Sequence, residues 1–137
     1  MTVYLSSQTI RVFINRPAQE VYEYAYNMEN FPQWVSICQS IQKADEGDAW
    51  MMETPYCISE VRVAQKNSFG VLDHRSIPAP GVEICDAMRV IPNGDGCEVF
   101  LTGFQMPGMS HEKFSQVITT GQQDLNNLKT VLEGGTE

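Results

Sequence analysis

The sequence is poor in the residues that most often bind metals or build disulfide scaffolds. It has two histidines, His74 and His111, and four cysteines that lie far apart, with no C-x-x-C pair. Metal sites need clustered thiolate or imidazole ligands, and disulfide scaffolds are typical of small secreted chains. We therefore expect no metal site, and free, mostly buried thiols. The four cysteines are Cys38, Cys57, Cys85 and Cys97.

Positive charge is also scarce. Nine Lys and Arg residues stand against 17 Asp and Glu, which gives a net charge of -8 at pH 7 and a pI near 4.6. The basic residues are scattered singly, whereas nucleic acids and anionic membranes require basic patches that neutralise phosphate. We expect neither nucleic acid nor stable membrane association.

Long hydrophobic runs are missing as well. No stretch approaches the ~20 apolar residues of a membrane span, and the first residues, M-T-V-Y-L-S-S-Q-T-I-R, lack the charged and apolar regions of a signal peptide. No linker, repeat or low-complexity run divides the 137 residues. These features predict a cytoplasmic protein with a single domain over residues 1–137.

A phosphate-binding loop is absent too. Gly94 and Gly96 are followed by a predicted strand rather than a helix, and no P-loop lysine follows them. The two glycines indicate a hairpin turn, and we expect no cofactor.

The most ordered pattern in the chain is one long amphipathic helix near the C-terminus. Ser110 is suited to cap its N-terminus, Glu112 and Lys129 suit the two ends of its dipole, and Gly134 provides a stop. Such a helix needs a broad apolar partner, for which a sheet is the natural choice. Its apolar stripe, at helical spacing, consists of Phe114, Val117, Ile118, Gly121, Leu125, Leu128 and Leu132.

The chain begins with a predicted strand and two predicted short helices. Alternating β-branched and aromatic residues predict a strand over Val3–Ile14. A helix is expected over Ala18–Asn27, with Pro17 in its first turn. The segment N-F-P-Q-W, residues 30–34, interrupts this helix because a residue before proline avoids helical geometry, and a second short helix is expected after the break.

Six further strands are predicted, joined by turn-forming residues. Short connections imply antiparallel neighbours, so the fold class is α+β. The predicted strands are Ser36–Lys43, Ala49–Thr54, Cys57–Lys66, Phe69–Ile77, Val82–Ile91 and Cys97–Gln105.

Strand parity places two polar residues among apolar neighbours: His74, on the same side as Leu72, and Asp86, on the same side as Met88. If the turn at residues 78–81 sets His74 opposite Asp86, their Cβ atoms would lie within ~5.5 Å. A carboxylate that orients and charges an imidazole is suited to general acid/base catalysis. The alternatives are a structural pair, or an Asp86 side chain that turns to solvent at a bulge.

Three parts of the sequence together resemble the START-like superfamily (SRPBCC), in particular its bacterial polyketide cyclase/dehydrase and lipid transport group. They are the opening I-R-V-F-I-N-R-P-A-Q-E-V, the N-F-P-Q-W corner and the terminal helix. The stretches F-G-V-L-D-H and M-R-V-I-P-N-G-D-G are similar to a bacterial subgroup whose function is unassigned. The resemblance implies a helix-grip fold: a curved seven-stranded antiparallel sheet around the long helix, with a cavity between them for an apolar or aromatic ligand.

The resemblance also implies which large side chains lie near that cavity. Plain core packing is the alternative for each of them. A glycine in mid-helix costs about 1 kcal/mol against alanine, so Gly121 on the apolar stripe leaves room for a ligand or for a close sheet contact. The candidate ligand-binding residues are Trp34, Trp50, Met52, Tyr56, Met88, Phe104, Met106, Met109, Phe114, Ile118 and Gly121.

Three functions are consistent with this sequence. The leading hypothesis is binding of a small hydrophobic or aromatic molecule, lipid or polyketide-like. The second is a cyclase or dehydratase that uses His74 and Asp86 as an acid/base pair. The third is a structural or regulatory module, as a homodimer, whose pocket is filled by its own side chains. A cavity of roughly 300 Å³ or more separates the third from the others.

Overall fold

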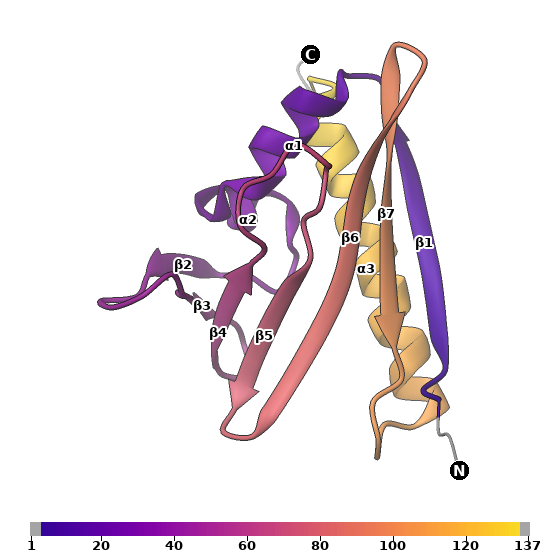
Figure 1. The fold of residues 1–137 in the computed structure, drawn as a ribbon. Helices are drawn as coiled ribbons and strands as arrows, with labels where there is room; N and C mark the ends of the chain where they lie inside the picture. Colours follow the sequence, from indigo (N-terminus) through magenta and orange to yellow (C-terminus); the bar gives the residue numbers. More distant parts are fainter. Residues whose placement is uncertain (1–3, 135–137) are drawn as a thin grey trace.

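The computed structural model describes residues 4–134 and contains seven strands, two α-helices of nine residues or fewer, one 3-10 turn and one long helix. Figure 1 shows their arrangement. In chain order the elements are β1 Ser7–Ile14, α1 Ala18–Tyr26, η1 Met28–Asn30, α2 Phe31–Trp34, β2 Ser40–Lys43, β3 Trp50–Glu53, β4 Ile58–Val63, β5 His74–Ala79, β6 Val82–Asn93, β7 Gly96–Phe104 and α3 His111–Leu132.

The seven strands form one antiparallel sheet in the order β1-β7-β6-β5-β4-β3-β2. Strands β2 to β7 pair with their neighbours along the chain, as short connections require. Strand β1 pairs with β7, from Ser7 opposite Phe104 to Ile14 opposite Cys97, which brings the first and last strands of the chain side by side. The predicted α+β class with seven strands is confirmed.

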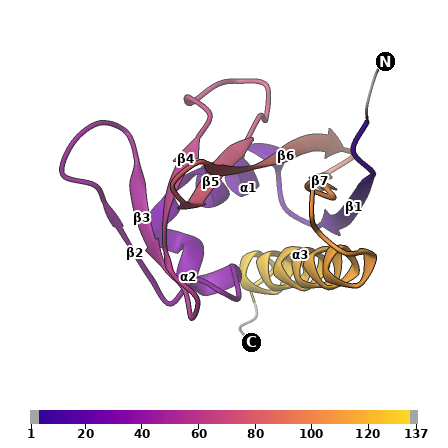
Figure 2. The same cartoon turned by 90° about the horizontal axis from the view of Figure 1, so that it is seen from below.

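The sheet is curved, and helices lie across its open side. Viewed from below, the sheet bends from β1 through β6 and round to β2 and β3, while α2 and α3 lie between its two ends (Figure 2). Helix α2 lies beside the C-terminal half of α3, where Asn127 Nδ2 donates to the Trp34 carbonyl.

Helix α3 begins and ends where the sequence predicts. The Ser110 hydroxyl accepts a hydrogen bond of 3.0 Å from the backbone N–H of Lys113, which is an N-cap interaction. At the other end, Lys129 Nζ donates to the Phe13 carbonyl and to Glu133 Oε2, both at 2.7 Å. Gly134 follows with a positive φ of 81°.

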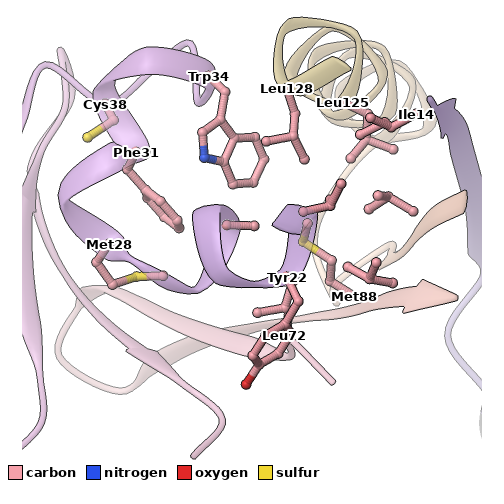
Figure 3. Packing of buried hydrophobic residues seen from close by; sticks show 14 of the residues in the cluster. Ile14, Tyr22, Met28, Phe31, Trp34, Cys38, Leu72, Met88, Leu125 and Leu128 are labelled. Carbon is pink, nitrogen blue, oxygen red and sulfur yellow. The ribbon is translucent and has the colours of Figure 1, made fainter. Parts of the chain in front are cut away.

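The C-terminal half of α3 packs into the hydrophobic core. Leu125 and Leu128 are fully buried, together with Ile14, Val21 and Val99. Figure 3 shows Leu125 and Leu128 of α3 beside Trp34 of α2 and Ile14 of β1. Burial of each leucine contributes about 1.5–3 kcal/mol, so this half of the helix fixes α3 on the sheet.

The first third of the chain differs from the prediction in two places. Strand β1 begins at Ser7 rather than Val3, which lies outside the described residues. The N-F-P-Q-W corner is itself the second helix: Phe31 is helical (φ -51°, ψ -44°) although it precedes Pro32, which lies in the first turn of α2. A helix after this corner was the wrong prediction, because a proline in the first turn leaves no hydrogen bond unmade.

The strand predicted over Phe69–Ile77 begins only at His74. Asn67 holds the preceding segment as a loop, because its side chain accepts from the N–H groups of Phe69 and Val71 and donates to the Gln65 and Val71 carbonyls. Gly70 adopts a positive φ of 74°, which breaks the extended geometry.

Candidate ligand-binding cavity

A cavity of about 410 Å³ lies between the sheet and the N-terminal half of α3. Strands β1, β3, β5, β6 and β7 contribute to its wall, as do α2 and the segment that follows α2. Its lining residues are Ile10, Phe31, Trp34, Val35, Ile37, Met52, Tyr56, His74, Ser76, Asp86, Met88, Leu101, Gly103, Lys113, Gln116, Val117, Ile118, Thr120, Gly121 and Asp124.

The two halves of helix α3 thus have different surroundings. Val117, Thr120, Gly121 and Asp124, at helical spacings of three and four, border the cavity, while Leu125 and the turns after it enter the core. The predicted apolar stripe is therefore buried only in part, and Val117 is 39% exposed.

Gly121 of α3 faces the part of the cavity wall that β1 and β7 form. A Cβ atom added to it would lie 3.1 Å from Cδ1 of Ile10 and 3.6 Å from Cδ2 of Leu101. Both neighbours also line the cavity. The glycine therefore serves both roles that its position in the sequence suggested: it permits a close sheet contact and it borders the cavity.

The inner end of the cavity is closed by Phe31, Trp34, His74 and Met88. These four residues also border a gap in the core that is too small for a water molecule, so the cavity does not extend beyond them. Phe31 and Trp34 pack edge to face with their ring centroids 5.4 Å apart, and Phe31 meets the His74 ring at 6.2 Å.

Trp34 carries a buried indole N–H that has no hydrogen-bond partner among the described residues. Figure 3 shows this nitrogen on the side of the ring that faces Phe31.

His74 and Asp86 lie directly opposite each other on β5 and β6, at the inner end of the cavity. His74 Nε2 is 3.4 Å from Asp86 Oδ2, and the two side chains are 15% and 30% exposed. His74 Nδ1 lies 3.1 Å from the carbonyl oxygen of Leu72. The register that the acid/base hypothesis requires is therefore present, and the bulge in this hairpin falls beyond it, between Ser76 and Ala79.

The surroundings of His74 favour its charged form. Burial of the ring lowers the pKa of His74, but the hydrogen bond and negative charge of Asp86 outweigh it, with smaller contributions from the Leu72 carbonyl and Asp73. The pKa of His74 consequently lies above its ordinary value.

A second carboxylate, that of Asp124, borders the cavity from α3. It accepts hydrogen bonds from both the N–H and the hydroxyl of Ser36. Burial nevertheless raises the pKa of Asp124 above its ordinary value, because it disfavours the charged form more than these two bonds favour it.

The structure brings eight of the predicted site residues to this cavity and leaves five away from it. Phe104 follows the inward-facing Gly103 on β7, so it points the other way and is 37% exposed. Phe114 is buried beneath the start of α3, and Trp50 lies at the start of β3, where Lys43 Nζ is 5.9 Å from the centre of its ring. Met106 and Met109 lie in the β7–α3 loop. The residues that do line the cavity are Trp34, Met52, Tyr56, His74, Asp86, Met88, Ile118 and Gly121.

Sequence reasoning missed most of the polar lining. Asp124 and Thr120 were detectable, because they lie three residues after and one residue before Gly121 on the same helix. Ser76 was detectable from its parity with His74 on β5. Ile37 lies in an irregular segment that was predicted as strand, so no periodicity identified it.

The four cysteines are free thiols, but only Cys38 and Cys97 are buried; Cys57 is half-buried and Cys85 is exposed. Within residues 4–134, no group of three or more His, Cys, Asp and Glu side chains is arranged to hold a metal ion. None of the helices in this range is both long and apolar enough to span a membrane.

Solved structures with the same fold match nearly the whole chain. The protein XoxI from Bacillus cereus has a TM-score of 0.80 at 14% sequence identity, over 97% of this chain and 99% of that one. The aromatase/cyclase Zhui from Streptomyces sp. R1128 has a TM-score of 0.77 at 13% identity, over 95% of this chain and 94% of that one. This is the START-like fold.

The START-like resemblance predicted from the sequence is thus confirmed for the fold. A third structure, the di-domain ARO/CYC BexL from the BE-7585A biosynthetic pathway, has a TM-score of 0.77 at 16% identity and is covered over 47% of its length by 94% of this chain. No family model and no curated protein sequence matches the chain. At these identities the likeness establishes the START-like architecture and assigns neither a ligand nor a reaction.

Proposed function

We propose that this protein binds a small hydrophobic or aromatic molecule, lipid or polyketide-like, in the cavity between its sheet and α3. The observation that carries the proposal is the cavity itself. Its volume of about 410 Å³ lies in the range of small-molecule sites, roughly 300–1,000 Å³.

The chemistry of the lining supports an apolar ligand with a flat or irregular shape. Phe31 and Trp34 offer aromatic surfaces at the inner end, and Met52 and Met88 offer flexible side chains that adapt to varied shapes. Zhui and BexL, which share the fold, are named as aromatase/cyclases, and this supports a polyketide-like ligand.

The volume argues against the hypothesis of a pocket filled by its own side chains. A filled pocket would leave less than the roughly 300 Å³ that an organic ligand needs. A homodimer is compatible with ligand binding, and native mass spectrometry on freshly purified protein would report the subunit number and any co-purified molecule together.

A matched pair of variants tests where binding occurs. Thr120 borders the cavity and its neighbour Thr119 is exposed, so Thr120→Phe fills the cavity while Thr119→Phe makes the same chemical change outside it. We expect the wild type and Thr119→Phe to bind the neutral fluorescent probe N-phenylnaphthylamine saturably, and Thr120→Phe to bind it at least about tenfold more weakly.

Absence of saturable binding in the wild type would refute the proposal. Equal binding by the two variants would move the site away from this cavity. Circular dichroism of both variants checks that the fold is intact.

One observation favours a second candidate function, an enzyme of cyclase or dehydratase type. The His74–Asp86 pair lies at the closed end of the cavity, where a bound carbonyl compound would meet titratable groups away from bulk water. If the pair is catalytic, His74→Ala abolishes turnover of a substrate that still binds. Unchanged turnover in that variant excludes His74 from the reaction.

A further inference from the structure

Both ring nitrogens of His74 are already engaged by the protein. Nδ1 faces the Leu72 carbonyl at 3.1 Å, and Nε2 faces Asp86 Oδ2 at 3.4 Å. A carbonyl oxygen and a carboxylate oxygen are both acceptors only, so each nitrogen must present a proton to its neighbour. Asp86 favours the charged ring, and an imidazolium whose two N–H groups face these acceptors has no lone pair to offer a ligand.

Asp86 is in the opposite situation. Among residues 4–134, the contact from His74 to Oδ2 is the one polar side-chain interaction recorded for its carboxylate. A carboxylate has two oxygens with about four acceptor positions. Asp86 lines the cavity and is 30% exposed, so its remaining acceptor positions are open to a molecule in the cavity.

The second carboxylate on the cavity wall points to the same ligand chemistry. Asp124 also presents acceptors, and two of its positions are taken by Ser36. The cationic side chain of Lys113 borders the cavity from the first turn of α3, where it is exposed. A ligand that brings a carboxylate to the inner end would meet the negative charge of Asp86 without a free cation beside it, because the His74 protons are already directed at the protein.

We propose that Asp86 is the residue that contacts the ligand's polar group, that His74 is a positioning residue which orients Asp86, and that the cavity selects aromatic molecules bearing a hydrogen-bond donor, such as a hydroxyl, over those bearing a carboxylate. This inference rests on the proposed function. It also reverses the roles within the pair: in an enzyme built on this site, Asp86 would exchange the proton with the substrate, and His74 would tune it.

Three probes of one shape test the selection. β-Naphthol carries a donor, its methyl ether lacks the donor, and β-naphthoate carries a carboxylate. Isothermal titration of the wild type should give at least about tenfold tighter binding of β-naphthol than of the methyl ether, since a hydrogen bond to a charged group is worth about this factor or more. β-Naphthoate should bind most weakly.

Two variants separate the roles of the pair. Asp86→Asn removes the charge and introduces an amide N–H, so the preference for β-naphthol should fall below about threefold and β-naphthoate should bind more tightly. His74→Gln keeps the carboxylate, so a preference for β-naphthol of about threefold or more should persist. The proposal is overturned if His74→Gln abolishes the preference while Asp86→Asn retains it.

A measurement on the wild type does not depend on any variant. Nitrogen NMR of the imidazole should show both His74 nitrogens protonated at pH 7, and saturating β-naphthol should leave both protonated. A lone pair at Nε2 that accepts a hydrogen bond from the ligand would overturn the assignment.

The results also distinguish this inference from the proposed function. If all three probes bind equally and Thr120→Phe weakens all of them, the cavity is a binding site and the role of Asp86 is wrong. If no naphthalene binds, both proposals fail.

Discussion

The carboxylate of Asp124 on α3 accepts two hydrogen bonds from Ser36, one of 2.9 Å from its N–H and one of 2.7 Å from its hydroxyl. These bonds join the middle of the long helix to the segment that leaves α2, at the border between the cavity and the core. Asn127 adds a third polar contact from α3, since its Nδ2 donates to the Trp34 carbonyl at 3.2 Å. The position of α2, and with it the closed end of the cavity, therefore depends on polar residues of α3 as well as on its leucines.

The first prediction concerns the charge of Asp124. Because the pKa of Asp124 is raised on folding, its contribution to stability is greatest below its ordinary pKa of 3.8 and is lost as the pH rises through the folded-state pKa. Asp124→Asn keeps an oxygen that accepts from Ser36 and removes the buried charge. Relative to the wild type, the variant should gain stability between about pH 4 and pH 7, measured by urea denaturation.

Asp45→Asn is the control for this prediction, since it removes the same charge from an exposed loop. If the two variants change in parallel with pH, net charge rather than burial of Asp124 causes the effect.

The second prediction concerns the pH dependence caused by His74. Its folded-state pKa is raised above the ordinary 6.5, so the stabilisation from its ion pair is complete below about pH 6 and is lost as the pH rises through the folded value. The charged groups that act on it are Asp86 on β6 and Asp73 just before β5, while Phe31 of α2 contributes an uncharged ring. The free energy of unfolding should therefore fall above neutral pH, and His74→Gln should remove that fall.

His111→Gln serves as the matched control, because His111 is exposed in the first turn of α3. If His111→Gln also loses the pH dependence of the free energy of unfolding, His111 rather than His74 causes it.

The third prediction concerns Gly121. Alanine is favoured over glycine in a helix interior by about 1 kcal/mol. The new Cβ would lie 3.1 Å from Cδ1 of Ile10, which is the mobile end of a side chain that borders the cavity and has space to move into. Gly121→Ala should therefore stabilise the protein by about 0.5–1 kcal/mol in thermal or urea denaturation.

Thr119→Ala, at an exposed position of the same helix, measures the gain in helix propensity without the contact. A Gly121→Ala variant less stable than the wild type would show that Ile10 is held firmly in place.

The fourth prediction concerns Gly70, where the chain passes against β6. Its φ is 74°, and an added Cβ would lie 2.2 Å from the carbonyl oxygen of Val90, a backbone atom in a strand that is held on both sides. Gly70→Ala should cost about 3 kcal/mol or more. Gly94→Ala shares the positive φ of 60° but meets no atom within 4 Å, so it should cost only about 1 kcal/mol. Similar losses in urea denaturation would show that backbone conformation alone matters at Gly70.

Some residues of the cavity could be predicted from the sequence because they follow the periodicity of a strand or a helix. Parity along β5 and β6 placed His74 and Asp86 on the inner face, since alternate side chains of a strand share a side. The spacing in α3 identified Ile118 and Gly121 for the same kind of reason. By contrast, Phe104 was expected at the cavity as a large side chain that the resemblance places there, but it lies on the opposite side of β7 from the cavity-lining Gly103.

The loop at residues 64–73 shows where local patterns fail. The hydrophobic residues at 69, 71 and 72 resemble a strand, but the side chain of Asn67 satisfies the backbone that a strand partner would have paired. A tertiary contact, the hydrogen bond from the Asn67 N–H to the Tyr22 hydroxyl at 2.9 Å, anchors this loop to α1. A local sequence pattern cannot predict a hydrogen-bond partner 45 residues away.

By itself the amino-acid sequence determined the order of strands and helices, the caps of α3 and the inward side of β5 and β6, because these depend on neighbours within a few residues. Only the tertiary structure decided that α3 would divide between core and cavity and that Asp124 would meet Ser36. It also decided that His74 would be held on both sides, with Asp86 left open to the cavity. These relationships depend on the curvature of the sheet and on contacts between distant segments, where the free energy of packing selects one arrangement among many that satisfy the same local pattern.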